Sequence, residues 1–293
     1  MAISNVQTGA QPASATSQSS PLVMRIIGAV ALAHLINDLI QSVLPSIYPM
    51  LKANYGLSFT QVGLITLTFQ LTASLLQPWV GYHTDRYPKP WLLPAGTVCT
   101  LIGILMMSVV GTFPLILLAA GLIGIGSSTF HPEASRVARL ASGGRFGLAQ
   151  STFQVGGNAG SAFGPLLAAA IIIPFGQGHV AWFGLFAVFA LFVLYRISRW
   201  YANHLSLFKL KQGQAATHGL SKNRVISALV VLGLLVFSKY FYMSSLTSYF
   251  TFYLIEKFDL SVASSQLHLF LFLGAVAAGT FFGGPIGDKI GRK

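Results

Sequence analysis

The string GYHTDR at Gly81–Arg86 is followed by a similar string, GPIGDK at Gly284–Lys289, 203 residues further along the chain. Both copies place a glycine first, an aspartate fifth and a basic residue sixth, and each follows a long apolar stretch. The same offset carries Leu57-Ser58 onto Leu260-Ser261. Several matches at one offset predict an internal duplication.

The composition places this duplication in a membrane. The chain has 293 residues, of which 54% are hydrophobic and 8% are charged. Soluble domains carry about 25% charged residues, so an ordinary soluble enzyme and a disordered protein are both excluded. The net charge is +12, but the basic residues lie between apolar runs. This pattern favours an integral membrane protein over a nucleic-acid partner.

Eight apolar stretches have about the 20 residues that a helix needs to cross a bilayer. We therefore expect an all-α membrane protein. The predicted spans are Arg25–Met50, Phe59–Tyr82, Trp91–Gly111, Pro114–Ala134, Phe146–Ile173, Val180–Tyr201, Val225–Leu254 and Val262–Ile286.

The distribution of the 18 basic residues between the two sides of the membrane supports these eight spans. Fifteen fall on the side of the N-terminus, Lys52 and Lys257 fall on the other side, and Lys239 lies inside a span. The positive-inside rule predicts that the fifteen and the N-terminus are cytoplasmic, in a bacterial-type inner (plasma) membrane.

The two copies of the repeated string are separated by six spans, so both run the same way through the membrane, as parallel repeats do. A repeat unit of 203 residues predicts a protein of roughly 400 residues with twelve helices, and the chain is expected to lack helices 9–12. The expected organisation is a disordered cytoplasmic tail (1–23), a six-helix bundle (24–202), a cytoplasmic linker (203–222) and the first two helices of a second bundle (223–293).

The repeated turn resembles that of the major facilitator superfamily. The second copy, from Gly284 to Lys293, matches the superfamily's loop pattern in full, whereas the first copy has Pro88 and Pro90 where glycine and a basic residue are usual. The resemblance implies a gating role for this turn, as a cytoplasmic latch; the alternative is that it only determines topology. The gating residues would be Gly81, Asp85, Arg86, Gly284, Asp288, Lys289 and Arg292.

Within the superfamily, HLIND at 34–38, FHPE at 130–133 and KYFYM at 239–243 resemble the fosmidomycin-resistance efflux transporters. This resemblance implies alternating-access export of a small anionic drug such as fosmidomycin in exchange for protons, by a protein that is monomeric when full length. The expected partners are this substrate, protons and the lipid bilayer, with no nucleic acid, cofactor or metal. The alternatives are an importer or symporter of a phosphorylated or anionic metabolite, and a fragment that transports nothing.

Two residues at membrane depth are candidates for substrate and proton binding. Asp38 follows Arg25 by thirteen residues, about 20 Å along a helix, and Lys239 has a similar depth in the seventh span. A charge at the bilayer centre costs roughly 2.5–3.5 kcal/mol, so a function or a partner is expected. The hypotheses are an Asp38–Lys239 ion pair or competition between Asp38 and an anionic substrate for Lys239. His34, one turn from Asp38, would relay protons or simply pack.

His131 and Glu133 are further candidates near the end of the fourth span. Pro132 removes a backbone donor and is expected to open or kink the helix there. Glu133 would either shuttle a proton or pair with Arg136, three residues on. The sequence contains no Ser/His/Asp set or HExxH helix, so neither enzymatic hydrolysis nor metal catalysis is expected.

Small residues recur every four positions in the fifth and eighth spans, which predicts faces for close helix packing. Because these spans belong to different halves, their contact would form a sliding seam. The residues are Gly156, Gly160, Gly164, Pro165, Gly279 and Gly283.

Overall fold

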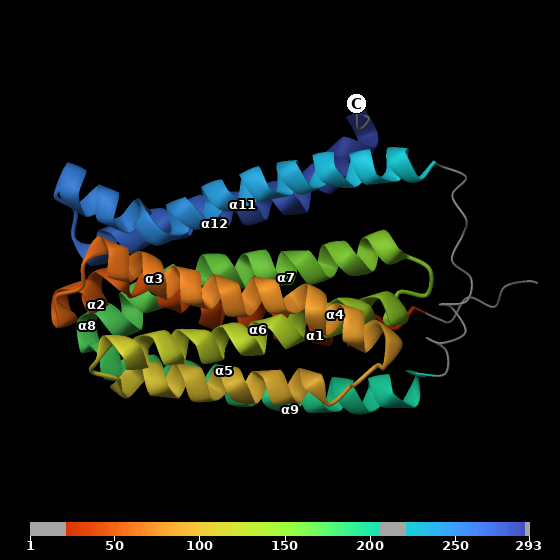
Figure 1. Cartoon of the computed structure of the whole chain (residues 1–293), viewed down its shortest axis with the longest axis horizontal. Coiled ribbons are helices and arrows are strands. Elements are labelled where there is room, and N and C mark those ends of the chain that lie inside the picture. The colour runs from red at the N-terminus through yellow and green to blue at the C-terminus, as the bar shows by residue number, and fades with distance from the viewer. Residues whose placement is uncertain (1–21, 206–220, 291–293) are drawn as a thin grey trace, which may run out of the picture.

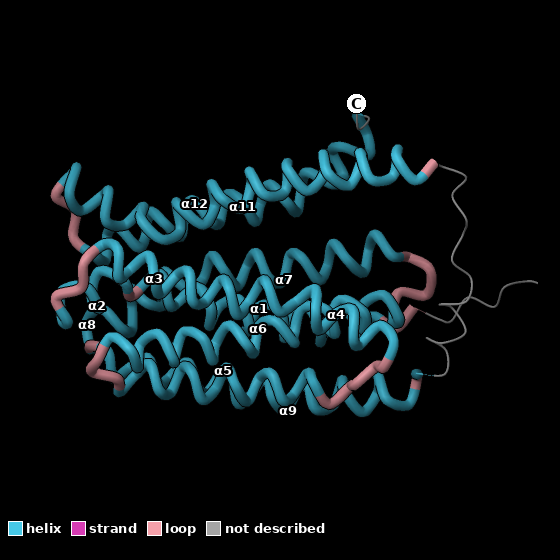
Figure 2. The backbone as a smooth tube through the Cα atoms, viewed as in Figure 1, coloured by secondary structure: helices cyan, strands magenta, loops and turns pink. Residues whose placement is uncertain are grey.

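The computed structural model describes residues 22–205 and 221–290, with side chains up to Phe282 in the last helix. These residues form helices and short connections, with no strand among them (Figure 2). The expected all-α architecture is therefore confirmed. Most of the predicted tail and linker lies outside the described residues, as does Arg292.

The helices fall into eight segments that are long and apolar enough to cross a membrane, as the sequence predicts. Two segments contain a π-helical turn, and one begins with a 3₁₀ turn. The elements are α1 (Met24–Ser46), α2 (Tyr48–Tyr55), α3 (Phe59–Gln70), η1 (Leu71–Leu75), α4 (Leu76–Arg86), α5 (Leu92–Val109), α6 (Phe113–Ala141), α7 (Phe146–Leu167), η2 (Ala168–Ile172), α8 (Ile173–Phe175), η3 (Gln177–Trp182), α9 (Phe183–Asn203), α11 (Lys222–Phe258) and α12 (Val262–Ile290).

The chain runs back and forth between two ends of an elongated bundle (Figure 1). The start of α1, the α4–α5 and α6–α7 connections and the start of α11 share one end, which we call the basic end because Arg86, Arg139 and Arg145 lie there. The α2–α3 and α11–α12 connections mark the opposite end, where α2 carries Lys52 and the last turn of α11 carries Lys257.

α1 is the central element of the six-span bundle formed by α1–α9. Its buried residues follow the helix from Ile27 to Leu44 and join two large apolar clusters. Because lipid is as apolar as these side chains, close packing rather than water exclusion holds such helices together.

The small-residue face of α7 provides this close packing. A Cβ atom at Gly156 or Gly160 would collide with the backbone of α1, and one at Gly164 would collide with Ser42. The glycines of α7 therefore pack closely, but against α1 within the same bundle rather than across the two halves. The expected contact between the fifth and eighth spans is present, while sliding along it stays a prediction. α7 meets α12 through other residues, Ala162 and Phe163.

The eighth-span stripe has no comparable contact in the described part of the chain. A Cβ at Gly279 would meet nothing within 4 Å. The side chain surroundings of residue 283 lie outside the described residues. Pro165 is buried within α7, three residues before η2 begins.

α6 continues as an α-helix through Pro132 to Ala141. The helix therefore does not open at this proline, while the alternative expectation, a kink, stays a prediction. His131 and Glu133 therefore lie on the same helix but contact different residues: His131 contacts Asp38, and Glu133 contacts Arg136.

Candidate substrate and proton site

A cavity of about 1040 Å³ lies between the six-span bundle and the α11–α12 pair. Residues of α1, α2, α3, η1, α4, α6, α7, α11 and α12 line it. Among the described lining residues, Asp38 is the only carboxylate and Lys239 is the only lysine or arginine. The two candidates from the sequence therefore line the same cavity, Asp38 from α1 and Lys239 from α11.

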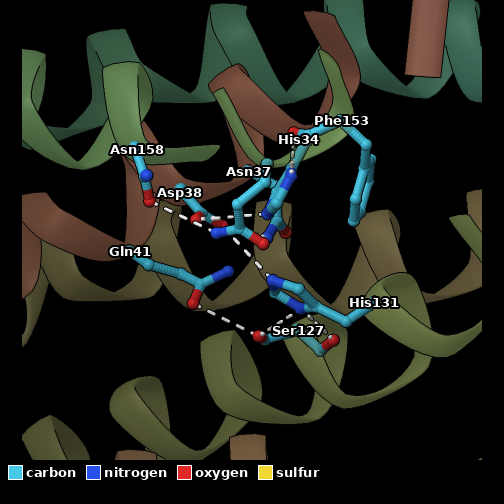
Figure 3. Close-up of polar contacts among 9 residues, drawn as sticks. His34, Asn37, Asp38, Gln41, Ser127, His131, Phe153 and Asn158 are labelled. Carbon is cyan, nitrogen blue, oxygen red and sulfur yellow. Dashed lines mark hydrogen bonds and ion pairs between the residues drawn. The ribbon is translucent and has the colours of Figure 1, made fainter. Parts of the chain in front are cut away.

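Asp38 contacts two histidines, as Figure 3 shows. Its Oδ2 lies 3.3 Å from Nε2 of His34, one turn earlier on α1. Its Oδ1 lies 3.5 Å from Nε2 of His131 on α6. We call His34, Asp38 and His131 the Asp38 triad. The side-chain amide of Asn37 also donates to Oδ1, at 3.0 Å.

Backbone carbonyls hold both histidine rings in place. Nδ1 of His34 lies 2.7 Å from the carbonyl oxygen of Phe153, whose ring stacks on the imidazole with centroids 4.0 Å apart. Nδ1 of His131 lies 3.0 Å from the carbonyl oxygen of Ser127. The hydroxyl of Ser127 donates to Gln41 at 3.2 Å. α1, α6 and α7 thus position the triad together.

Gly157 leaves the space that the triad occupies, a role that the sequence analysis did not assign. A Cβ at this position would lie 2.5 Å from His34 Nε2 and 2.7 Å from Asp38 Oδ2. The signal in the sequence was ambiguous, because Gly157 is next to Gly156 of the packing face and helix phase alone does not separate the two roles.

Lys239 does not pair directly with Asp38. The ion pairs that the described part of the chain gives Asp38 are those with the two histidines. Lys239 Nζ instead lies 5.4 Å from the ring centroid of Tyr240, on an exposed face of α11. The direct ion pair is therefore not formed among the described side chains, and the second hypothesis, competition between Asp38 and an anionic substrate for Lys239, stays a prediction.

Neutral polar side chains cover much of the remaining cavity wall. They can donate to and accept from a polar solute without adding charge. The amide residues are Gln41, Gln70, Gln77, Gln154 and Asn158. The π-helical turn η1 places Ala73 and Ser74 in the same wall, and such turns occur frequently at functional sites.

Glu133 belongs to a separate charged cluster. It is fully buried, and its Oε1 accepts from Arg136 at 2.6 Å, which confirms the pairing that the sequence suggested. Arg136 also binds Asp85 and donates to Thr84 at 3.1 Å. Glu133 is not among the cavity residues, so the structure separates it from the Asp38 triad.

The first copy of the repeated turn is tied to its own bundle. Asp85 at the end of α4 binds Arg136 of α6, and Arg86 lies over the Tyr82 ring at 4.2 Å. A Cβ at Gly81 would be 3.9 Å from Pro132. The side chains of the second copy, Gly284, Asp288 and Lys289, lie outside the described ones, so a latch between the halves stays a prediction.

Comparison with known proteins gives a consistent assignment. The family model described as Major Facilitator Superfamily matches residues 30–293. The chain is 56% identical over 293 residues to the fosmidomycin resistance protein of Escherichia coli (strain K12), covering all of this chain and 72% of that protein. It is 39% identical over 275 residues to the uncharacterized MFS-type transporter YfnC of Bacillus subtilis (strain 168), covering 92% of this chain and 67% of that protein.

Solved structures agree at the level of the fold. A bacterial homologue of the human lysosomal transporter Spinster, in an inward-facing and occupied conformation, superposes with a TM-score of 0.68 at 16% identity. The inward-facing and unoccupied form gives 0.67. The matched regions cover 92% and 94% of this chain but only 62% and 64% of those chains, so the present chain spans less than two thirds of their length.

Proposed function

Because the chain belongs to the major facilitator superfamily, a class of transporters rather than enzymes, we propose that it forms part of a proton-coupled efflux transporter for a small anionic compound such as fosmidomycin. The proposal refers to the protein that contains this chain, since the chain spans 72% of its E. coli relative. One observation supports it: Asp38 of α1 and Lys239 of α11 both line one cavity, and no other described lining residue is an acid, a lysine or an arginine.

Lys239 is the attracting group for the anion. Its ammonium group is exposed to the cavity and makes no ion pair among the described side chains. A phosphonate or phosphate would gain a charge-assisted contact there, which is about twice as strong as a neutral hydrogen bond. The amides of Gln154 and Asn158 on α7 would then bind the polar remainder of the substrate.

Asp38 is the proton-exchanging group. It is the carboxylate that faces the substrate space, and it lies on the central helix of the bundle. A protonated Asp38 leaves Lys239 free to hold an anion, whereas a charged Asp38 competes with the anion for Lys239. Proton binding at Asp38 and anion binding at Lys239 therefore promote each other, which links the two sites thermodynamically. Taken alone, this sign of linkage suits transport of proton and anion together, the alternative drawn from the sequence, so the transport experiment below assigns the direction of coupling.

The membrane location follows from the distribution of charge. Arg86, Arg139 and Arg145 lie at the basic end, so this end and the N-terminus are proposed to face the cytoplasm of a bacterial inner membrane. A monomeric state is proposed because the cavity is formed within one chain.

Transport in membrane vesicles with an imposed pH gradient tests the proposal. An antiporter moves fosmidomycin into the vesicles when protons flow out of them. Collapse of the proton gradient by an ionophore should then abolish fosmidomycin accumulation. Accumulation driven in the same direction as the protons would instead assign a symporter, and an absence of transport in both arrangements would contradict either function.

A further inference from the structure

We propose that the Asp38 triad is also a binding site for a divalent transition metal, with Zn²⁺ as the fitting ion. The described part of the chain brings the ligand atoms of His34, Asp38 and His131 within 4.8 Å of one another. The sequence predicted no metal site, because His131 is 97 residues from His34 and the histidines show no metal-ligand spacing. This inference goes beyond transport and does not depend on the substrate. The ion would compete with the proton that the proposed function assigns to Asp38, so metal-bound and proton-bound forms are alternatives.

The hydrogen bonds of the two rings determine which nitrogen is available. Nδ1 of His34 faces the Phe153 carbonyl at 2.7 Å, and Nδ1 of His131 faces the Ser127 carbonyl at 3.0 Å. A carbonyl oxygen can only accept, so each Nδ1 carries the hydrogen. In the neutral rings, both Nε2 atoms then present lone pairs to Asp38.

Two lone pairs that face one carboxylate require a positive charge between them. The Nε2 atoms lie 3.3 Å and 3.5 Å from the Asp38 oxygens, and each of these contacts joins two acceptors unless a proton or a metal ion intervenes. The same carbonyl bonds that set this arrangement are the usual outer-shell partners of metal-binding histidines, where they fix ring orientation.

The distances suit zinc. Zinc–nitrogen and zinc–oxygen bonds of about 2.0–2.2 Å in a tetrahedron place neighbouring ligand atoms about 3.3–3.6 Å apart. The two nitrogen–oxygen separations of 3.3 Å and 3.5 Å fall in this range, but they involve different Asp38 oxygens. The three ligand atoms lie within 4.8 Å of one another, so small side-chain rotations complete the set around one ion. Imidazole nitrogen with a carboxylate favours zinc and its neighbours over Mg²⁺ or Ca²⁺, which prefer oxygen ligands alone.

The surroundings leave room for access and for a fourth ligand. Asp38 and His131 side chains are 18% and 26% exposed and face the cavity, so an ion can enter from there. Gln41 Nε2 is buried and has no hydrogen-bond partner among the described residues, and its amide lies beside the triad in Figure 3. A water on the open side of the zinc ion could accept a hydrogen bond from it.

Metal binding to the purified protein tests the site without any transport measurement. Co²⁺ is the spectroscopic probe, because tetrahedral Co²⁺ absorbs visible light strongly, and Zn²⁺ is then added as the competitor. We expect one Co²⁺ per chain with tetrahedral absorption, displaced by Zn²⁺, and at least tenfold weaker binding in Asp38→Asn and in His131→Gln.

His268→Gln is the matched control. Nδ1 of His268 also faces a backbone carbonyl, that of Ser264 at 2.8 Å, but His268 is exposed and has no ion pair with a carboxylate among the described residues. Binding should be unchanged in this variant. Circular dichroism and gel filtration establish that each variant is folded. Lack of a saturable tetrahedral Co²⁺ signal in the folded wild-type protein, or equal affinity in Asp38→Asn and wild type, would overturn the zinc site and leave the proposed export unaffected.

Discussion

Gln266 on α12 donates its side-chain amide to the backbone carbonyl oxygen of Ser46 on α1, in a buried hydrogen bond of 2.7 Å. Nearby, the hydroxyls of Thr66 and Ser248 lie 3.3 Å apart. Both contacts join the six-span bundle to the α11–α12 pair toward the opposite end, away from the basic end. From Leu229 to Leu235, by contrast, α11 is exposed. The structure therefore holds the two parts together at one end.

Loss of the Gln266 bond should loosen this closed end. In Gln266→Leu, the buried Ser46 carbonyl loses its side-chain donor, which costs about 1–3 kcal/mol. Removal of the buried Gln266 Oε1, which has no partner among the described residues, offsets part of this cost. A net change of about 1.4 kcal/mol shifts a two-state equilibrium tenfold. Spin labels at Ala53 and Lys257, both exposed near this end, report the distance between the two parts by double electron–electron resonance. We expect a new population at longer distance, absent in the His268→Gln control; identical distance distributions would contradict the prediction.

Arg136 should be important for stability rather than for substrate binding. Arg136→Gln leaves the fully buried Glu133 carboxylate without its ion-pair partner, and breaking a buried pair in this way costs about 3–5 kcal/mol. Thermal unfolding in detergent should show a large loss of stability.

Two further variants make this test specific. Adding Glu133→Gln to Arg136→Gln removes the unpaired charge and should recover part of the lost stability. Arg139→Gln on the same helix removes an exposed contact with the Phe146 ring and should cost only about 0.5–1 kcal/mol. Equal melting temperatures for Arg136→Gln and Arg139→Gln would refute this assignment.

Gly157→Ala should damage the Asp38 triad. The added methyl group would lie 2.7 Å from Asp38 Oδ2 and against the His34 ring, so both side chains must move. Gly147→Ala, in the same helix, adds its methyl group to open space. Both changes favour the isolated helix by about 1 kcal/mol, so helix propensity does not distinguish them. We expect at least tenfold slower transport only in Gly157→Ala, and comparable rates in the two variants would show that the triad tolerates displacement.

The spans and their charge distribution could be predicted because they follow from composition and length along one chain. The i,i+4 contact of His34 with Asp38 and the i,i+3 pair of Glu133 with Arg136 were also accessible, since helix geometry alone brings such residues together. His131 was a candidate, but its contact with Asp38 joins two helices that no local pattern connects.

The choice of helix neighbours could not be predicted in the same way. Lipid-facing and protein-facing sides of a membrane helix are both apolar, so the glycine face of α7 shows that something packs closely but not that its partner is α1. The π-helical turn η1 and the space beside Gly157 depend on tertiary packing. The spacing of residues along the sequence does not predict either feature.

Comparison of Asp38→Asn with Lys239→Gln in vesicles tests the central claim that these residues divide proton and anion binding in one cavity. Asp38→Asn should lose accumulation driven by the pH gradient and retain exchange of labelled for unlabelled fosmidomycin, because the anion site is intact. Lys239→Gln should lose both, with at least tenfold weaker substrate binding, whereas Lys52→Gln, outside the cavity lining, should behave as wild type. Gradient-driven accumulation at the wild-type rate in Asp38→Asn and Lys239→Gln would contradict the account.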